Sequence, residues 1–197
     1  MKANDLNVLR DRAYRSACEH GFHDKELSDE HFIMLVITEL AEAVDADRKC
    51  RRAKVDSFKS WQYRFVPHTE EGRIRAFKED FEAYLKDTIE DELADATIRL
   101  LDLAGLRNID IENLTDEEIE DLSESCNGET FTESVYAIST MPIRYEYEYG
   151  YALETQLNRM LLAIFGLAKH LGIDLLWHIE QKMKYNELRP KMHGKAY

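Results

Sequence analysis

The chain has 197 residues, enough for one domain with a substantial core, and its 44% hydrophobic and 33% charged residues are typical of a folded globular protein. Its formal net charge of −13 argues against a general nucleic-acid-binding protein, because a phosphate backbone requires a basic surface. Only 8 Gly and 3 Pro interrupt the sequence, which favours long helices over an all-β fold.

The cysteines and the apolar stretches indicate in which cellular compartment the protein lies. Cys18, Cys50 and Cys126 are scattered and lack CxxC spacing, which indicates reduced thiols rather than a disulfide framework or a zinc site. The N-terminus lacks the apolar region of a signal peptide. The most apolar stretch, residues 160–168, is too short to span a bilayer and is followed by Lys169. We therefore expect a cytoplasmic protein that does not enter a membrane.

Helical periodicity predicts two helices at the start of the chain. Residues 4–20 carry apolar side chains at helical spacing and end near Gly21. Ser28 is a candidate N-cap for a second helix that runs to about Lys49. Residues 50–72 contain a basic run followed by aromatic residues, and we interpret them as a loop or lid with a short helix at most.

The next part of the chain is predicted to contain one long helix and an inserted segment. The long helix runs from about Arg73 to Leu103 and stops at Gly105. In the insertion, residues 106–150, Thr115 with Glu118 and Thr130 with Glu133 have the spacing of capping boxes and predict two short helices. The Tyr-rich stretch MPIRYEYEYGY, which ends the insertion, is interpreted as a loop.

The last part of the chain is predicted to form two further helices. One runs from about Ala152 to His170 and ends at Gly172, and the other begins after Asp174 and stops before Pro190. Together the patterns predict a single all-α domain, residues 1–197, built as a bundle of four or five main helices with the two inserted segments.

Two acidic pairs, Glu39 with Glu42 and Glu92 with Asp95, are the first candidate site. The members of each pair are three residues apart and therefore lie on one face of a helix, and both faces otherwise look half-buried. Carboxylates that face one another in such a place require a cation, and oxygen ligands suit Mg²⁺ or Mn²⁺. A di-iron bundle needs Glu-x-x-His motifs, and the sequence contains none.

The last predicted helix carries a second constellation. Lys182 and Asn186 lie four residues apart on one face, and Arg189 follows one turn later. Residues 182–195, which end at Lys195, hold five Lys or Arg and one acid, the reverse of the overall charge balance. These cations either complement the C-terminus of the helix dipole or grip the phosphates of a substrate.

The motifs ELAEA, DELADA and KMKYNELRPKMHGK together resemble those of the all-α nucleoside triphosphate pyrophosphohydrolases, the MazG-like group. The resemblance covers roughly residues 28–50, 80–104 and 176–195, and the 49 residues between the two acidic pairs are more than the compact members have. It implies Mg²⁺-dependent hydrolysis of a nucleoside triphosphate to the monophosphate and pyrophosphate by a homodimer or higher homo-oligomer. It also implies the following roles: metal ligands Glu39, Glu42, Glu92 and Asp95, and phosphate contacts Lys182 and Asn186, with Arg189 and Lys195 as further candidates.

The residues suit this chemistry, although they leave alternatives open. A metal-bound water could lose its proton to Glu39 or Glu42 and attack the α-phosphorus, which would expel pyrophosphate. The aromatic residues Trp61, Tyr63 and Phe65 either pack a loop onto the body or stack on the base. A nucleotide-binding regulatory protein that keeps the metal site without turnover is the main alternative, and a helical interaction module with solvated acidic pairs is a third.

Overall fold

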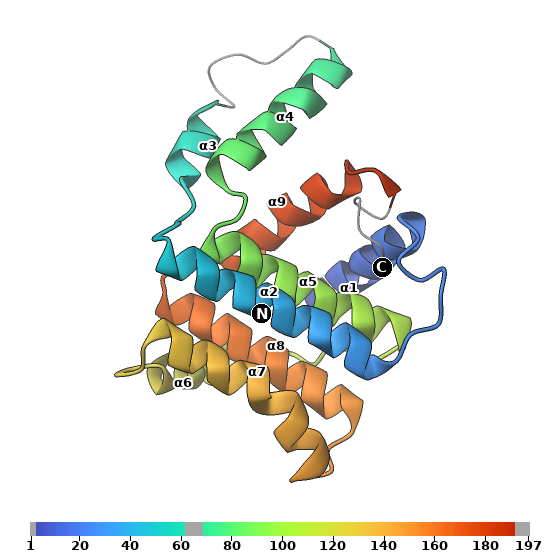
Figure 1. The fold of residues 1–197 in the computed structure, drawn as a ribbon, viewed down its shortest axis with the longest axis vertical. Coiled ribbons are helices and arrows are strands. Elements are labelled where there is room, and N and C mark those ends of the chain that lie inside the picture. The colour runs from blue at the N-terminus through green and yellow to red at the C-terminus, as the bar shows by residue number, and fades with distance from the viewer. Residues whose placement is uncertain (1–2, 62–68, 192–197) are drawn as a thin grey trace.

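The computed structural model describes residues 3–61 and 69–191, which form nine α-helices and no strand. Figure 1 labels them along the chain: α1 (Ala3–Glu19), α2 (Asp29–Arg48), α3 (Val55–Trp61), α4 (Glu70–Tyr84), α5 (Ile89–Leu106), α6 (Asp116–Ser125), α7 (Phe131–Tyr147), α8 (Leu153–His170) and α9 (Leu175–Glu187). The prediction of an all-α bundle is confirmed. Tyr63, Phe65, Lys195 and the side chain of Trp61 lie outside the described part.

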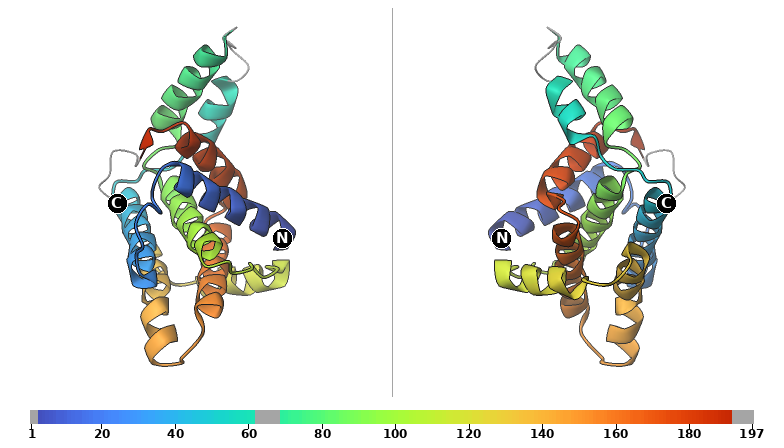
Figure 2. Two further views of the ribbon diagram at one scale, coloured as in Figure 1. Left: turned by 90° about the vertical axis from the view of Figure 1, so that its right-hand side faces the viewer. Right: turned by 90° about the vertical axis from the view of Figure 1, so that its left-hand side faces the viewer.

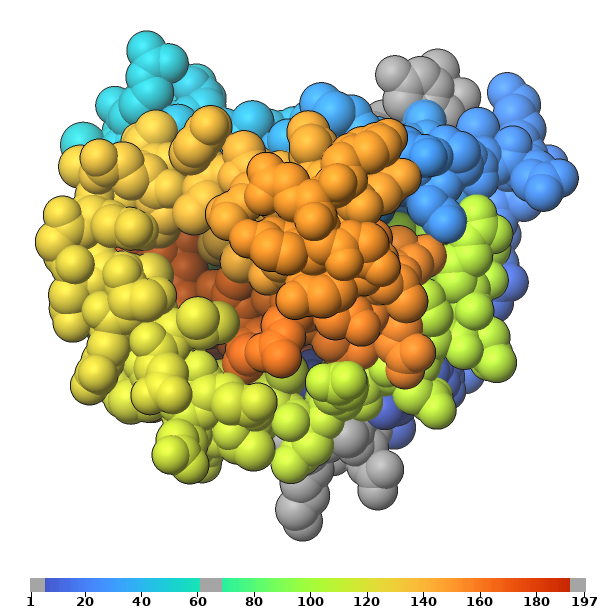
Figure 3. Space-filling model, turned by 90° about the horizontal axis from the view of Figure 1, so that it is seen from below, coloured from blue at the N-terminus to red at the C-terminus, as the bar shows by residue number. Residues whose placement is uncertain are grey.

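Helix α5 forms the centre of the bundle. It contacts α1, α2, α8 and α9, and 12 of its 18 residues are buried, including acidic residues of its first turn. In Figure 2 it lies between α2 and α1. Helix α8, also with 12 of its 18 residues buried, packs against α6 and α7, so the second inserted segment covers much of one end of the molecule (Figure 3).

Helices α3 and α4 form an arm that projects from the bundle beside α9 (Figure 1). A small hydrophobic cluster, separate from the main core, joins the arm to α9 through Phe58, Phe77, Phe81, Leu85 and Tyr185. The rings of Phe81 and Tyr185 stack with their centroids 4.3 Å apart. The arm is therefore anchored at its base, next to the first turn of α5.

The predicted long helix from Arg73 to Leu103 is wrong, because the chain breaks between α4 and α5. Asp87 adopts a positive φ of 57°, and Thr88 then caps α5 by accepting a hydrogen bond from the backbone N–H of Asp91. At the other end α5 continues through Gly105 to Leu106. A Cβ at Gly105 would lie 2.5 Å from the Cβ of Tyr14, so this glycine allows α1 to approach closely.

The loop predicted for the Tyr-rich stretch, residues 141–151, is wrong for its first part, because α7 contains Pro142 and continues to Tyr147, and only residues 148–151 are not helical. Proline removes one backbone donor from a helix interior. Here Pro142 is buried one turn after Ile138, which is also buried, so this face of α7 packs on the body of the protein. The apolar face outweighs the local signals from Pro142 and the charged residues.

The local helix signals are confirmed. The side chains of Ser28, Thr115, Thr130 and Asp174 each cap the helix that follows, and both Thr residues form complete capping boxes with Glu118 and Glu133. Gly172 has a φ of 69° directly after the C-cap of α8. Within the described residues no single helix is both long and apolar enough to cross a bilayer, and only α8 and α9 together, bent by 112°, would pass on length and composition.

Candidate metal site

Three of the four predicted carboxylates lie together between α2 and α5. One oxygen from each of Glu39, Glu92 and Asp95 lies within 4.8 Å of the others. Glu39 and Glu92 are each only 4% exposed, whereas Asp95 is partly exposed. The packing of α2 along α5 produces this arrangement, since Leu40 and Leu93, the neighbours of these glutamates, are fully buried in the main core.

Arg99, one turn after Asp95 on α5, pairs with Glu39. Its Nε donates a hydrogen bond of 2.6 Å to Glu39 Oε1, and the two side chains are 24% and 5% exposed. Burial opposes the charge on Arg99, but the carboxylates of Glu39 and Asp95 outweigh burial and raise the pKa of the guanidinium. Arg99 therefore gives Glu39 a charged partner inside the protein.

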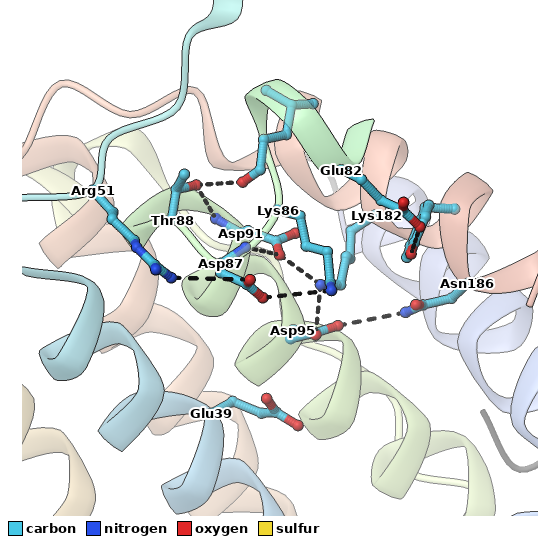
Figure 4. Close-up of polar contacts among 12 residues, drawn as sticks. Glu39, Arg51, Glu82, Lys86, Asp87, Thr88, Asp91, Asp95, Lys182 and Asn186 are labelled. Carbon is cyan, nitrogen blue, oxygen red and sulfur yellow. Dashed lines mark hydrogen bonds and ion pairs between the residues drawn. The ribbon is translucent and has the colours of Figure 1, made fainter. Parts of the chain in front are cut away.

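Lys182 extends from α9 to α5 and contacts two carboxylates (Figure 4). Its Nζ lies 2.7 Å from Asp91 Oδ2 and 2.8 Å from Asp95 Oδ2, and its side chain is only 5% exposed. Burial opposes ionisation of both partners, but the attraction between Lys182 and Asp95 lowers the pKa of Asp95 and raises that of Lys182. Asn186, one turn further along α9, donates from Nδ2 to Asp95 Oδ1 at 3.4 Å.

The carboxyl group of Glu92 differs from its neighbours. Among the described residues, no ion pair or side-chain hydrogen bond reaches it. Burial, the nearby charge of Asp91 and the further charges of Asp95 and Glu39 raise its pKa to about 9, despite the opposing effect of Lys182. Without a bound cation this carboxyl is neutral at pH 7, and a divalent cation would compete with its proton.

The other predicted site residues are placed as follows. Glu42 is exposed on α2 and does not belong to the group of three carboxylates. Arg189 lies just beyond α9, with its guanidinium carbon 5.9 Å from the ring centroid of Tyr185, and its carbonyl contacts His20 Nε2 at 3.1 Å. Lys195 lies outside the described residues.

Sequence reasoning missed two residues of this group, Asp91 and Arg99. Asp91 is 2% exposed, and burial, partly offset by Lys182, raises its pKa to about 6. The signal that could have found both is their spacing, because Asp91, Asp95 and Arg99 follow one another at intervals of four along one face of α5.

A cavity of about 70 Å³ adjoins Asp95 and Asn186 between α1, α5 and α9. One part of its wall is apolar and includes Phe22, Ile98 and Met183, and the other part is polar. The polar wall consists of Ser16, His20, Asp95, Arg99, Asp102, Asn186 and Arg189. The candidate metal site therefore borders a space with both apolar and hydrogen-bonding surfaces, as small-molecule sites usually have.

The donor set fits a hard divalent cation. Oxygens around one Mg²⁺ lie about 2.1 Å from the ion, so two of them are at most about 4.2 Å apart. Neighbouring ligands of an octahedral ion lie closer, about 3 Å apart, so the carboxylate oxygens, all within 4.8 Å of one another, would have to approach by up to about 2 Å. The buried Glu92 carboxyl, which has no cationic partner in direct contact, supplies the free ligand that such an ion requires.

Comparisons with protein-family models, with curated proteins and with solved structures give no match to this chain.

Proposed function

We propose that this protein is a Mg²⁺-dependent nucleoside triphosphate pyrophosphohydrolase, for which Mn²⁺ would also serve. The observation that carries the proposal is the convergence of Glu39, Glu92 and Asp95 from two helices, with the Glu92 carboxyl buried and unpaired. Lys182 and Asn186 reach the same group from α9. Together these side chains offer ligands for a cation next to donors for phosphate oxygens.

In this proposal each residue has a defined role. Glu39, Glu92 and Asp95 hold Mg²⁺, which supplies charge neutralisation and lowers the pKa of a bound water. Glu39 or Glu42 accepts the proton of the water that attacks the α-phosphorus, and pyrophosphate leaves. Lys182 and Asn186 bind phosphate oxygens, for which Lys182 has to leave Asp95.

The cavity between α1, α5 and α9 is the proposed place of part of the nucleoside, and at about 70 Å³ it would have to widen to hold the whole group. It begins at Asp95 and Asn186, so a triphosphate bound at the metal would direct its sugar and base toward Phe22 and Met183.

The proposed homodimer or higher oligomer is supported by an exposed apolar face on α7. Tyr136, Ile143 and Tyr147 recur at helical spacing on α7 and are 61% to 76% exposed, which is unusual for large apolar side chains.

A second candidate is a nucleotide-binding regulatory protein without turnover. The pairing of Lys182 and Arg99 with the carboxylates favours it, because the protein's own cations already stabilise much of the negative charge. A helical interaction module with solvated acidic pairs has less support, since Glu39 and Glu92 are both buried.

Pyrophosphate release tests the proposal. The purified protein is incubated with Mg²⁺ and each common ribo- and deoxyribonucleoside triphosphate, and the products are identified by chromatography. We expect a monophosphate and pyrophosphate, with kcat lowered at least about 100-fold in Glu39→Gln and Glu92→Gln. Glu124→Gln, an exposed change on α6, is the control and should retain full activity. Nucleotide binding without any product would instead support the regulatory protein.

A further inference from the structure

Both carboxylate oxygens of Asp95 are already occupied by donors from α9. Lys182 Nζ contacts Oδ2 at 2.8 Å, and Asn186 Nδ2 contacts Oδ1 at 3.4 Å. An ammonium group and a divalent cation on the same carboxylate would lie within about 4 Å of each other and repel strongly in a buried site. For Asp95 to act as a metal ligand, Lys182 therefore has to withdraw.

Asp91 provides the place to which Lys182 can withdraw. Its Oδ2 lies 2.7 Å from Lys182 Nζ and also accepts a hydrogen bond of 3.1 Å from the backbone N–H of Asp87. That N–H belongs to the positive-φ turn between α4 and α5, so the backbone fixes the carboxylate in position (Figure 4). Asp91 does not belong to the group of three carboxylates that could hold a metal ion.

The charges of these carboxylates, Lys182 and Arg99 also favour Asp95 as a metal ligand and Asp91 as the partner of Lys182. With Glu39, Asp91, Glu92 and Asp95 ionised, four negative charges face the two positive charges of Lys182 and Arg99, and one divalent cation balances the remainder. This balance holds only if Lys182 stays in the group after it leaves Asp95. A carboxylate outside the metal site is needed to keep it there, and Asp91 is that carboxylate.

We propose that Lys182 neutralises Asp95 until a divalent cation binds, and that Asp91 is the positioning residue that retains Lys182 when the cation takes its place. This inference rests on the cation site of the proposed function but does not depend on turnover. It makes the metal and Lys182 competitors for Asp95, and it makes Lys182 available to a phosphate only once the metal is bound.

Mn²⁺ affinity of the full chain without nucleotide, measured from the electron paramagnetic resonance signal of free Mn²⁺, tests the proposal. Lys182→Met removes the competitor and should tighten Mn²⁺ binding about tenfold. Asp91→Asn leaves Lys182 with Asp95 alone and should weaken binding about tenfold, and Asp91→Glu should restore much of the loss. In the Lys182→Met background, Asp91→Asn should change the affinity hardly at all.

Two results would overturn the proposal. If Asp91→Asn weakens Mn²⁺ binding equally with and without Lys182, Asp91 acts by its own charge or by supporting the fold, not through the lysine. Mn²⁺ that binds none of these proteins would remove the site altogether. If Mn²⁺ binds and the effect of Asp91→Asn on its affinity depends on Lys182 as expected, but no pyrophosphate is released, the hydrolase is refuted and this inference stands.

A measurement on the unmodified protein covers the case in which the variants do not fold. Acetic anhydride labels accessible lysine amines, and mass spectrometry reports the rate at each position. Saturating Mg²⁺ should make Lys182 react severalfold faster, because it loses one of its two carboxylate partners. Lys169, which pairs with Glu120 between α8 and α6, is the internal control and should not change. An unchanged rate at Lys182 would contradict the displacement.

Discussion

Replacing Glu92 by Gln should stabilise the metal-free protein, although Glu92 is a proposed ligand. The folded state keeps its carboxyl protonated up to a pH of about 9, whereas the unfolded chain loses this proton above about 4.5. pH 7 lies about 2.5 units above the pKa of this carboxyl in the unfolded chain, so folding has to protonate it. This protonation costs about 3 kcal/mol, at 1.4 kcal/mol per unit. Gln has a similar shape and carries no proton to take up, so Glu92→Gln removes this cost.

The sign and the pH dependence make this prediction specific. Because the folded pKa is raised, the stability that Glu92 contributes is lost as pH rises from about 4.5 toward 9. Urea denaturation in EDTA gives the free energy of unfolding of both proteins. The value for Glu92→Gln should exceed that of the unmodified protein by less than about 1 kcal/mol at pH 5 and by about 3 kcal/mol at pH 7.

Glu39→Gln is the matched control, because Glu39 is equally buried but pairs with Arg99. It should destabilise the protein by about 1 to 3 kcal/mol, since Arg99 loses a charged partner. A gap for Glu92→Gln that does not change with pH, or a loss of stability at pH 8, would refute the view that this carboxyl is buried without a cation.

Three further predictions concern the cation, a buried histidine and the helix caps. Mg²⁺ or Mn²⁺ at 100 times its dissociation constant should add about 2.7 kcal/mol to the stability of the unmodified protein and nothing to Glu92→Gln, as read from thermal melts. Burial lowers the pKa of His178 to about 4, so stability should fall by about 3 kcal/mol as pH drops from 6.5 to 4, and urea titrations of His178→Gln should lack this part of the fall. Thr115→Ala and Thr130→Ala should each lower stability by about 1 kcal/mol in the same titrations, and no loss in either would show that the capping boxes do not hold α6 and α7.

The sequence predicts this fold well where a signal is local. Caps such as Ser28 and Asp174 act within one turn, so the residues next to them suffice. The break between α4 and α5 is different, because Phe81, Leu85 and Ile89 keep helical spacing straight through it. Phe81 and Leu85 pack in the cluster of the arm and Ile89 in the main core, and periodicity does not reveal that a buried face has changed its partner.

The same limit applies to the candidate site. Spacing places Glu92 and Asp95 on one face of a helix, and the structure brings that face to Glu39. Spacing does not say what lies opposite, so the contact of Lys182 with Asp91 and Asp95 could not be predicted. That contact depends on the crossing of α5 and α9, which are separated along the chain by the second insertion and α8.

Crystals grown with MnCl₂ and a non-hydrolysable triphosphate analogue, measured at the manganese absorption edge, test the central claim most directly. We predict an anomalous difference peak about 2.1 to 2.3 Å from carboxylate oxygens of Glu39, Glu92 and Asp95. The phosphates should lie on the side of Lys182. Density for the analogue with no manganese peak among these carboxylates, or with the ion bound elsewhere, would contradict the assignment of the site.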